Sequence, residues 1–331
     1  MSRCNAVGID IGGAYTKVAS TSGRTKSFYF PLWKENSLSN LLCLIKKEFD
    51  PENVGVVMTA ELADVFASKK EGVHYIASCV RSVFEHPYFF SMEGRFSQII
   101  DDQRWNIFAA SNWKASAIFV GARICDCIFV DIGSTTCDVI PIEGGKPLAS
   151  TTDFQRLCKD ELIYMGVLRT PLAALLHAAC LKGRSCHVSS ELYAITADVY
   201  RILGNISEAQ YSCHTPDDRP RDICACMQRV ARMFLCDVDE LGREQVVHIA
   251  RSVERIQVEM LATALAKHIQ KCGLKPIVGA GLGEFIIAKA AEMNGFKYRS
   301  LARLCGEHVA EVLPAYATAQ LLQQTLEPGT M

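Results

Sequence analysis

The sequence has no excess charge of either sign, no long apolar run and no low-complexity segment. It carries 35 basic and 36 acidic residues, which gives a net charge of -1. Such a balance creates no general attraction for nucleic acid or an anionic membrane, so we expect neither as a partner. No apolar run is long enough to cross a bilayer, and residues 1–5 lead into a predicted strand without a signal-peptide core. We therefore expect a cytoplasmic protein that binds small molecules, and the sequence leaves a homo-oligomer open.

Cysteine, by contrast, is abundant. The 15 cysteines are odd in number, and several lie in apolar helical patterns, such as Cys43, Cys79 and Cys180. In a chain of this length these features favour reduced thiols over a disulfide framework, and we predict that most are buried.

A second group of cysteines raises the alternative of a zinc site. Cys213, His214, Cys224 and Cys226 are close in sequence, but they lack the usual two-residue gap within a ligand pair. Because free cysteine is commonly a small buried hydrophobe, we favour that interpretation over zinc, and the sequence leaves the role of the four residues open.

Hydrophobic periodicity predicts an α/β protein. Strands are expected at Ala6–Ile11, Tyr15–Ser20, Lys26–Pro31, Val54–Thr59, Tyr88–Met92, from Ile128 through Ile142 with one interruption, Pro276–Gly279 and Lys297–Ser300. Helices are expected from a Ser37 cap to Phe49, at Glu61–Ala67, Gly72–Phe84, Trp105–Arg123, Asp160–Met165, Thr170–Ala179, Ser190–Leu203 and Arg221–Phe234, within Asp239–Cys272, and at Glu284–Asn294 and Val309–Leu326.

Two similar stretches suggest that the architecture repeats. They read VGIDIGGAYTKV at Val7–Val18 and VDIGSTTCDVIPI at Val130–Ile142. In each, an apolar strand leads to an aspartate, a glycine follows two residues later, and hydroxyl residues come before a second apolar run. A glycine lets the backbone turn tightly enough to expose its N–H groups. We therefore predict two phosphate-binding hairpins, one in each half of the chain.

The residue types in these hairpins match the chemistry of phosphate binding. The predicted phosphate-binding residues are Gly12, Gly13, Thr16, Gly133, Ser134, Thr135 and Thr136. Asp10 and Asp131 are the predicted magnesium ligands, because Mg²⁺ keeps several waters and needs few protein carboxylates. Lys17 adds a candidate positive charge.

A third glycine-rich turn, VGAGLGEF, joins a strand to a helix near the C-terminus. Its glycines Gly279, Gly281 and Gly283 could admit an anion or a flat ring close to the backbone. The turn superficially fits a dinucleotide fingerprint, but no second βαβ unit follows it. We therefore discount a dinucleotide-dependent dehydrogenase and treat these glycines as candidate cofactor-binding residues.

The order of these three motifs resembles the two phosphate motifs and the adenosine motif of the actin/sugar kinase/Hsp70 superfold. Five further pieces narrow the resemblance: AASNWKASA, FVDIGSTTCDVIPI, MGVLRTPLAAL, ITADVYRILG and VGAGLGEF. Together they are similar to the MfnF-like family of proteins linked to the tetrahydromethanopterin one-carbon pathway. The resemblance covers nearly the whole chain.

This resemblance implies two ribonuclease-H-like domains with an interdomain cleft. It places the first domain at residues 1–125 and the second at 126–331, with a helical insertion at about 151–272 and the glycine turn at 279–283. The last helix is expected to be able to pack back on the first domain.

The resemblance also implies a transferase of methanofuran biosynthesis. Such an enzyme joins 5-(aminomethyl)-3-furanmethanol diphosphate to the phenol of γ-glutamyltyramine and releases pyrophosphate. Arg169 and Lys17 are then candidate cationic contacts, and Asp138 is a candidate base or a contact for the substrate amine. Each has a structural alternative: Arg169 a surface salt bridge, and Asp138 the capping of a turn. The motif Asn112–Lys114 is interpreted first as helix packing by its tryptophan.

Two other functions stay open. One is an ATP-dependent small-molecule kinase of the same superfold, and the other is a non-catalytic, nucleotide-dependent regulator. The preferred reaction allows ATP binding but does not require it. Since the superfold hosts many functions, only the family-specific pieces favour the transferase.

Overall fold

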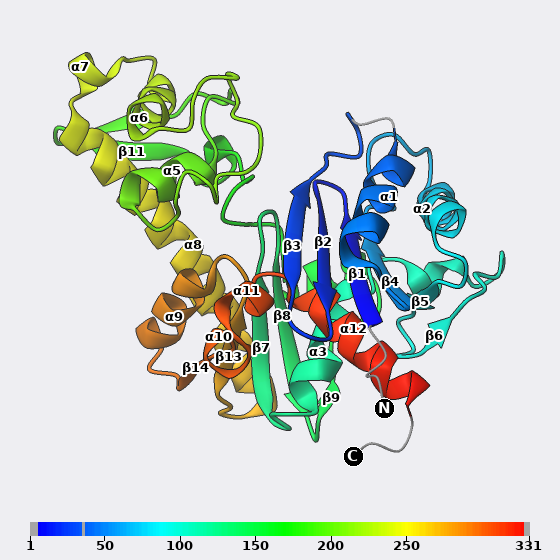
Figure 1. Ribbon diagram of the computed structural model, residues 1–331. Coiled ribbons are helices and arrows are strands. Elements are labelled where there is room, and N and C mark those ends of the chain that lie inside the picture. Colours follow the sequence, from blue (N-terminus) through cyan, green and yellow to red (C-terminus); the bar gives the residue numbers. More distant parts are fainter. Residues whose placement is uncertain (1–5, 35–36, 328–331) are drawn as a thin grey trace. The chain divides into compact units, whose positions relative to one another are not determined.

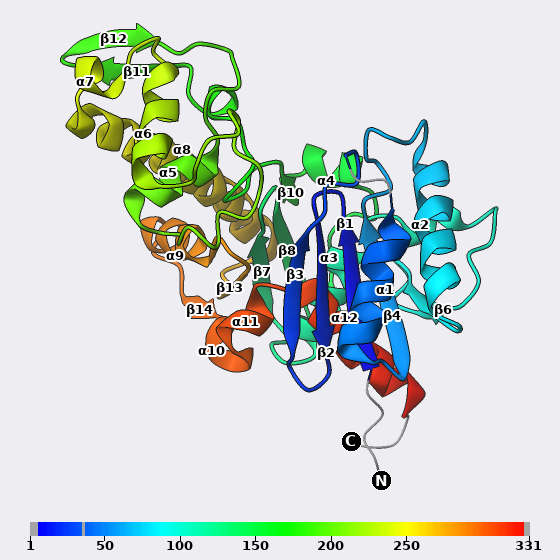
Figure 2. The same cartoon turned by 45° about the horizontal axis from the view of Figure 1, so that its top comes forward.

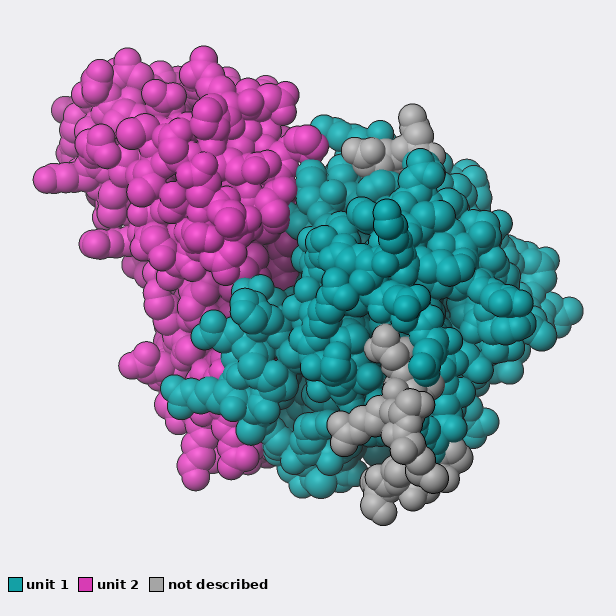
Figure 3. Space-filling model, in the orientation of Figure 1, with its two compact units in different colours: residues 1–127, 140–156, 301–331 teal, residues 128–139, 157–300 magenta. Residues whose placement is uncertain are grey.

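The computed structural model describes residues 6–34 and 37–327, and the chain forms two compact units (Figure 3). Unit 1 takes its residues from 1–127, 140–156 and 301–331, and unit 2 from 128–139 and 157–300. The predicted domain boundary at residues 125–126 stays a prediction. Figures 1 and 2 show the elements within each unit.

The strands are short and lie in three sheets. They are β1 (Ala6–Gly12), β2 (Tyr15–Ser20), β3 (Thr25–Tyr29), β4 (Asn53–Thr59), β5 (Tyr88–Phe90), β6 (Phe96–Ser97), β7 (Cys127–Ile132), β8 (Cys137–Glu143), β9 (Lys146–Pro147), β10 (Leu162–Ile163), β11 (Ala178–Leu181), β12 (Arg184–His187), β13 (Ile277–Ala280) and β14 (Tyr298–Ser300).

The helices range from one turn to more than eight. They are α1 (Leu38–Phe49), α2 (Lys69–Val83), α3 (Asn112–Gly121), α4 (Asp153–Cys158), α5 (Thr196–Leu203), α6 (Ile223–Arg232), α7 (Val238–Leu241), α8 (Arg243–Cys272), α9 (Glu284–Met293), α10 (Ala302–Cys305), α11 (Glu307–Ala310) and α12 (Leu313–Leu326), with 3₁₀ turns at Trp105–Phe108 and Leu172–Ala174. None of these described helices has both the length and the apolar character needed to cross a membrane.

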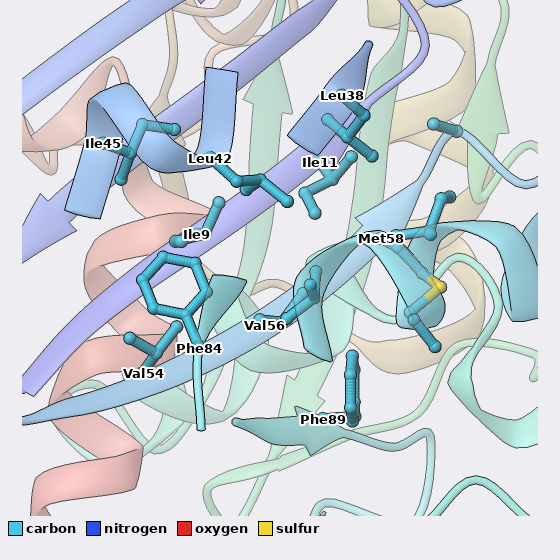
Figure 4. Close-up of a cluster of buried hydrophobic side chains, with 14 of the residues drawn as sticks. Ile9, Ile11, Leu38, Leu42, Ile45, Val54, Val56, Met58, Phe84 and Phe89 are labelled. Carbon is cyan, nitrogen blue, oxygen red and sulfur yellow. The ribbon is translucent and has the colours of Figure 1, made fainter. Parts of the chain in front are cut away.

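The sheet of unit 1 has the order β3-β2-β1-β4-β5-β6. β1 and β2 form an antiparallel hairpin, whereas β1 and β4 run parallel. Alternating residues of β1 point to opposite faces, because side chains alternate along a strand. Ile9 and Ile11 lie with Leu42 of α1 in the hydrophobic core (Figure 4). The opposite face packs against α12.

The second sheet repeats this arrangement, with the order β10-β8-β7-β13-β14. Strand β7 lies between its neighbour β8 and the parallel strand β13, as β1 lies between β2 and β4. The predicted repeat of architecture is therefore confirmed. The turn between β8 and β9 is formed by Gly144 and Gly145, which both have left-handed φ, 53° and 78°.

The first helix agrees closely with its prediction. The Ser37 side chain accepts a hydrogen bond from the Asn40 N–H, so it caps α1 as expected. The helix ends at Phe49, and Asp50 follows in a left-handed conformation. Local capping signals were sufficient here because they act within one turn of the helix end.

The helix predicted at Glu61–Ala67 is wrong, because these residues form irregular turns. Glu61 is buried while Leu62 and Val65 are exposed, so no helical face gathers the apolar side chains. The next helix instead starts at Lys69, capped by Ser68, whose side chain accepts from the Glu71 N–H.

The single helix predicted at Trp105–Arg123 is also wrong, because it is interrupted. A 3₁₀ turn ends at Phe108, and α3 starts at Asn112. Between them Ala110 has φ 49°, a left-handed conformation that no α-helix contains. Alanine content predicts helix, but tertiary contacts outweigh that weak preference here.

The predictions for the insertion were the least accurate. No helix forms at Asp160–Met165 or Thr170–Ala179. These segments contain β10, a 3₁₀ turn and the start of β11, and such short strands have too few residues to show a clear period. Further corrections are that α4 was not predicted, that α5 begins at Thr196, and that Val309–Leu326 is divided into α11 and α12.

The fourteen described cysteines all carry free thiols. The prediction that most are buried is wrong, because only four are: Cys127, Cys137, Cys213 and Cys226. Cys43 and Cys180 are exposed, since each occupies the outward side of its helix or strand.

Candidate functional site

The first predicted hairpin turns between β1 and β2. Asp10 lies opposite Lys17 of β2 and beside Val57 of β4, and it is 6% exposed. It is on the same face of β1 as Gly8, where a Cβ atom would contact Ala315 of α12. Asp10 therefore lies on the α12 side of the sheet, away from the core beneath α1.

The glycines of this turn have different surroundings. A Cβ on Gly12 would lie 2.8 Å from the Tyr15 carbonyl oxygen and 3.4 Å from Thr59 Oγ1, so the hairpin requires glycine there. A Cβ on Gly13 would have no atom within 4 Å. Thr16 is fully buried opposite Ile11, and its hydroxyl has no hydrogen-bond partner.

Lys17 has a contact that the sequence did not indicate. Its ammonium group donates a hydrogen bond of 3.1 Å to the Glu311 carbonyl oxygen, just before α12. In this arrangement Lys17 joins β2 to the end of the chain, and it would have to leave Glu311 to reach a phosphate.

The second predicted hairpin turns between β7 and β8. The Gly133 N–H donates to the Thr136 carbonyl at 2.9 Å, which closes the turn. Ser134, Thr135 and Thr136 are half-buried within it, and the hydroxyls of Ser134 and Thr135 lie 3.3 Å apart. The structure therefore gathers the three predicted hydroxyl residues of this turn.

The segment MGVLRTP packs directly on this second turn. The backbone N–H groups of Leu168 and Arg169 both donate to the Ser134 carbonyl at 3.0 Å. A Cβ on Gly166 would lie 2.4 Å from the Ser134 carbonyl carbon, so only glycine allows this approach. The Arg169 guanidinium then donates to Thr135 Oγ1 at 3.2 Å. The structure thus brings Arg169 to the predicted phosphate-binding hydroxyls.

The anchor of that segment was not predicted. The Gly166 carbonyl accepts hydrogen bonds from Thr196 Oγ1 at 3.0 Å and from Gln257 Nε2 at 3.2 Å. Gln257 also accepts from the Tyr200 hydroxyl at 2.5 Å. All three partners are fully buried, so α5 and α8 together hold MGVLRTP on the turn.

The third glycine turn also lies against the second hairpin. Gly281 has φ 87°, and a Cβ there would lie 2.3 Å from Asp131 Oδ1 and 2.4 Å from the Ile132 carbonyl oxygen. The Gly283 N–H donates to that same carbonyl at 2.9 Å. Gly279 packs under the Tyr298 ring, where a Cβ would lie 2.9 Å from the nearest ring atom. Two motifs that are about 150 residues apart are therefore in direct contact.

Asp138 lies further along β8. It is half-buried and pairs with Leu162 of β10, so it belongs to the sheet beyond the turn. The structure brings Asp131, Arg169 and the third turn to the second hairpin, and it leaves Asp138 on the adjoining strand.

Sequence reasoning missed Glu61. This residue follows β4 and is only 2% exposed. The pKa of its carboxyl group is raised to about 7, chiefly by burial and also by the nearby Asp153, against the opposing effect of two backbone N–H groups and Lys69. Its position just beyond the end of a strand parallel to β1 was the signal available, because the C-terminal ends of parallel strands share one edge.

The cysteines considered as zinc ligands differ in burial. Cys213 and Cys226 are buried, whereas Cys224 is exposed. Burial raises the pKa of the Cys213 thiol to about 11, and Cys226 Sγ contacts the Arg229 guanidinium at 3.3 Å. Within residues 6–34 and 37–327, no group of three or more His, Cys, Asp or Glu side chains is placed to hold a metal ion.

Comparison with a solved structure addresses the fold. The nucleotide-free structure of acetone carboxylase, from work on ATP-dependent acetone carboxylation, matches 95% of this chain and 70% of that chain with a TM-score of 0.57. The sequence identity is 10%, so the likeness concerns the fold alone. The predicted α/β class, with two ribonuclease-H-like domains of the actin/sugar kinase/Hsp70 type, is confirmed.

Two relatives found by sequence comparison indicate the family of this chain. A protein of Methanocaldococcus jannaschii is 37% identical over 97% of this chain and 98% of its own length. A protein of Methanococcus vannielii is 37% identical over 61% of this chain and 92% of its own length. Both are named as synthases of a furan-2-yl methanamine that bears a phenoxymethyl group with a γ-L-glutamylaminoethyl substituent. The family model for hydantoinase/oxoprolinase matches residues 52–325. The chain therefore belongs to the hydantoinase/oxoprolinase family and shares a closer family with these two synthases.

Proposed function

We propose that this chain is a transferase of methanofuran biosynthesis that forms an aryl–alkyl ether. It joins 5-(aminomethyl)-3-furanmethanol diphosphate to the phenol of γ-glutamyltyramine and releases pyrophosphate. The observation that carries the proposal is the relative that is 37% identical over 97% of the chain, whose name describes a compound with this ether linkage.

The second hairpin supports a diphosphate as the leaving group. Its turn presents the hydroxyls of Ser134, Thr135 and Thr136, and Arg169 is already hydrogen-bonded to Thr135. Hydroxyl and guanidinium donors stabilise the negative charge that grows on a departing diphosphate. We assign these residues and Gly133 to one end of the diphosphate. Gly12 and Gly13 are proposed to contribute backbone N–H groups, with Thr16 and Lys17 as further candidates.

The carboxylates suit a magnesium ion. Asp10 and Asp131 supply hard oxygen donors, the kind that Mg²⁺ prefers, and each lies on the strand that leads into a predicted phosphate turn. A bound Mg²⁺ would neutralise charge on the diphosphate. We propose both aspartates as ligands. Gly279, Gly281 and Gly283 are proposed to shape the backbone beside Asp131 for a bound group.

The reaction then needs one bond to form and one to break. The phenol oxygen attacks the furan methylene carbon, and the carbon–oxygen bond to the diphosphate breaks with its electron pair leaving on pyrophosphate. The phenol proton passes to a base, for which we propose Asp138. The chain's main contribution is to hold both substrates in line and to keep water away from the methylene carbon.

Incubation of the purified chain with the two substrates and Mg²⁺, without ATP, tests this function. We expect the ether product by mass spectrometry and one pyrophosphate per product. Asp131→Asn should lower kcat/KM by about 100-fold, as expected for a group that stabilises developing charge, whereas the exposed Asp64→Asn should change it little. ATP-dependent phosphate transfer, or nucleotide binding with no ether formed from the two substrates, would contradict the proposal.

A further inference from the structure

Glu61 is fixed in the loop between β4 and α2. Thr59, two residues earlier, is the register partner of Gly12 and lies beside it. A Cβ on Gly72 would lie 2.2 Å from the Glu61 carbonyl oxygen, so α2 contacts the backbone of Glu61 directly. Glu61 is thus held next to the first glycine turn of unit 1 by the sheet on one side and by α2 on the other.

Its carboxyl group is buried without a full set of partners. The side chain is 2% exposed, and Oε2 has no hydrogen bond. The stabilising neighbours are the backbone N–H groups of Glu61 and Ala110 and the ammonium of Lys69. A buried carboxylate oxygen without a partner loses its hydration and gains nothing in exchange.

The other charged groups nearby do not compensate for this. Asp153 adds a second negative charge. That carboxylate contacts Arg156, whose guanidinium lies 3.2 Å from Asp153 Oδ1 and 4.4 Å from the centre of the Trp113 ring. The Lys69 ammonium and two backbone N–H groups therefore do not offset the burial of Glu61, and the net effect still raises the pKa of its carboxyl group.

The segment before α3 adds a second observation. Ala110, whose N–H contacts Glu61, has the left-handed φ of 49°. Ser111, the next residue, is fully buried, and its hydroxyl has no partner. Left-handed backbone in a residue other than glycine is strained and is retained where the surroundings require it. Glu61 Oε2 and the Ser111 hydroxyl thus both lack partners, and Ser111 directly follows the residue whose N–H contacts Glu61.

From this geometry we infer that Glu61 binds the primary ammonium group of a substrate, with its free Oε2 as the acceptor. This inference rests on the proposed function, in which both substrates carry such a group. One is the aminomethyl group on the furan, and the other is the α-amino group of the γ-glutamyl end. An ammonium ion supplies a positive charge and up to three N–H donors, which suits a buried carboxylate with an unpartnered oxygen.

Binding of small amines tests the inference without any turnover. The probes are furan-2-ylmethanamine, its neutral analogue furan-2-ylmethanol, and γ-glutamylethylamide for the other source. Calorimetry should show at least one amine binding about 10-fold more tightly to the wild type than to Glu61→Gln, as for loss of a charge-assisted hydrogen bond. The neutral alcohol should not distinguish the two proteins, and Asp64→Asn, in the same loop, should bind like the wild type.

The pH dependence sharpens this test. The probe amines lose their protons mainly above the range in which the Glu61 carboxyl group titrates, so measurements from about pH 6 to 7.5 report chiefly on that carboxyl group. Amine affinity should therefore rise with pH through about 7 in the wild type and stay flat in Glu61→Gln. Equal amine affinity in wild type and Glu61→Gln for both amines would overturn the inference, as would Mg²⁺ binding that depends on Glu61 while amine binding does not.

Turnover separates this inference from the proposed function. If the furan amine is the source, Glu61→Gln should raise KM for the aminomethyl substrate and leave KM unchanged for the analogue with a methyl group in its place. An equal loss of kcat with both substrates would instead identify a base or a structural role and contradict the inference. If no ether forms in any sample while Glu61-dependent amine binding persists, the proposed function fails and the ammonium site stands.

Discussion

Glu61 shows how strongly a residue's surroundings set its chemistry. As part of ELADVF it looks like an ordinary helix-forming acid, yet it is buried in a turn beside a second acid, Asp153. Burial disfavours the charged form, so the pKa of its carboxyl group rises to about 7. An ionised, buried carboxylate of this kind lowers the free energy of unfolding at neutral pH, and this effect can be measured.

The stability of unit 1 should depend on the ionisation of Glu61. Below about pH 4.5 the carboxyl is protonated in both states; as pH rises, the unfolded chain ionises first and the folded state loses relative stability until about pH 7. Glu61→Gln does not titrate, so its advantage over the wild type should grow by roughly 2 kcal/mol between about pH 5.5 and pH 8.5.

Urea denaturation followed by tryptophan fluorescence measures this effect. The three tryptophans, Trp33, Trp105 and Trp113, all belong to unit 1, so the signal reports that unit. A pH-independent difference between Glu61→Gln and the wild type would show that the carboxyl group does not titrate in this range. A saturating amine ligand should reduce the difference, because it stabilises the ionised form.

At the scale of an element, the third glycine turn is the clearest case of close packing. It brings β13 and α9 against the end of β7, and Gly281 leaves no room for a side chain beside Asp131. A side chain there would displace a predicted metal ligand. This turn therefore couples the shape of the backbone to the position of Asp131.

Gly281→Ala should lower both stability and activity. The left-handed φ alone costs alanine about 1–2 kcal/mol, and contacts of 2.3–2.4 Å with Asp131 and Ile132 add to that cost. Gly183→Ala is the matched control, because Gly183 has φ 76° but no atom within 4 Å of its added Cβ. Gly281→Ala should lower the midpoint temperature of thermal denaturation, and kcat/KM for ether formation, more than Gly183→Ala does. If both variants lost stability and activity equally, the close approach of Gly281 to Asp131 would not contribute to the function.

At the scale of the whole molecule, α12 packs in the same unit as the first strands of the described chain. Unit 1 draws on residues from both termini and from the middle of the sequence, and α12 packs on β1, β2 and β4. The sheet of unit 1 is therefore covered on its second face only after nearly the entire chain has been made. Contacts between segments so far apart in sequence form slowly, because the chain loses the entropy of closing a long loop before these contacts stabilise it.

Gly8→Ala tests this connection. A Cβ on Gly8 would lie 1.9 Å from the Ala315 carbonyl oxygen, which is α12 backbone and cannot rotate away. We expect unit 1 to lose roughly 1–3 kcal/mol, the usual range for overpacking, with a lower urea midpoint by tryptophan fluorescence. Gly13→Ala, with no atom within 4 Å of its Cβ, should leave that midpoint nearly unchanged. A normal midpoint for Gly8→Ala would show that α12 does not contribute to the stability of unit 1.

Local signals in the sequence determined much of this architecture. The two Asp-x-Gly hairpins and the Ser37 cap follow from interactions within a few residues, so the sequence alone could predict them. The same is true of β1 and β4, whose largely apolar runs are buried on both faces of the sheet. Family-specific pieces such as MGVLRTP pointed to Arg169, and the structure places it on Thr135.

Tertiary structure alone decided the remainder. The break at Ala110 and the turns at 61–67 oppose local helix preference, because contacts with distant elements outweigh a preference of a few tenths of a kcal/mol per residue. The contact of Lys17 with Glu311 joins residues 294 positions apart, which no local pattern encodes. The burial of Glu61 arises in the same way, since β4, α2 and the Ala110 turn enclose it only after they pack together. Short-range hydrogen bonding is encoded in neighbouring residues, whereas burial and charge balance depend on the whole unit.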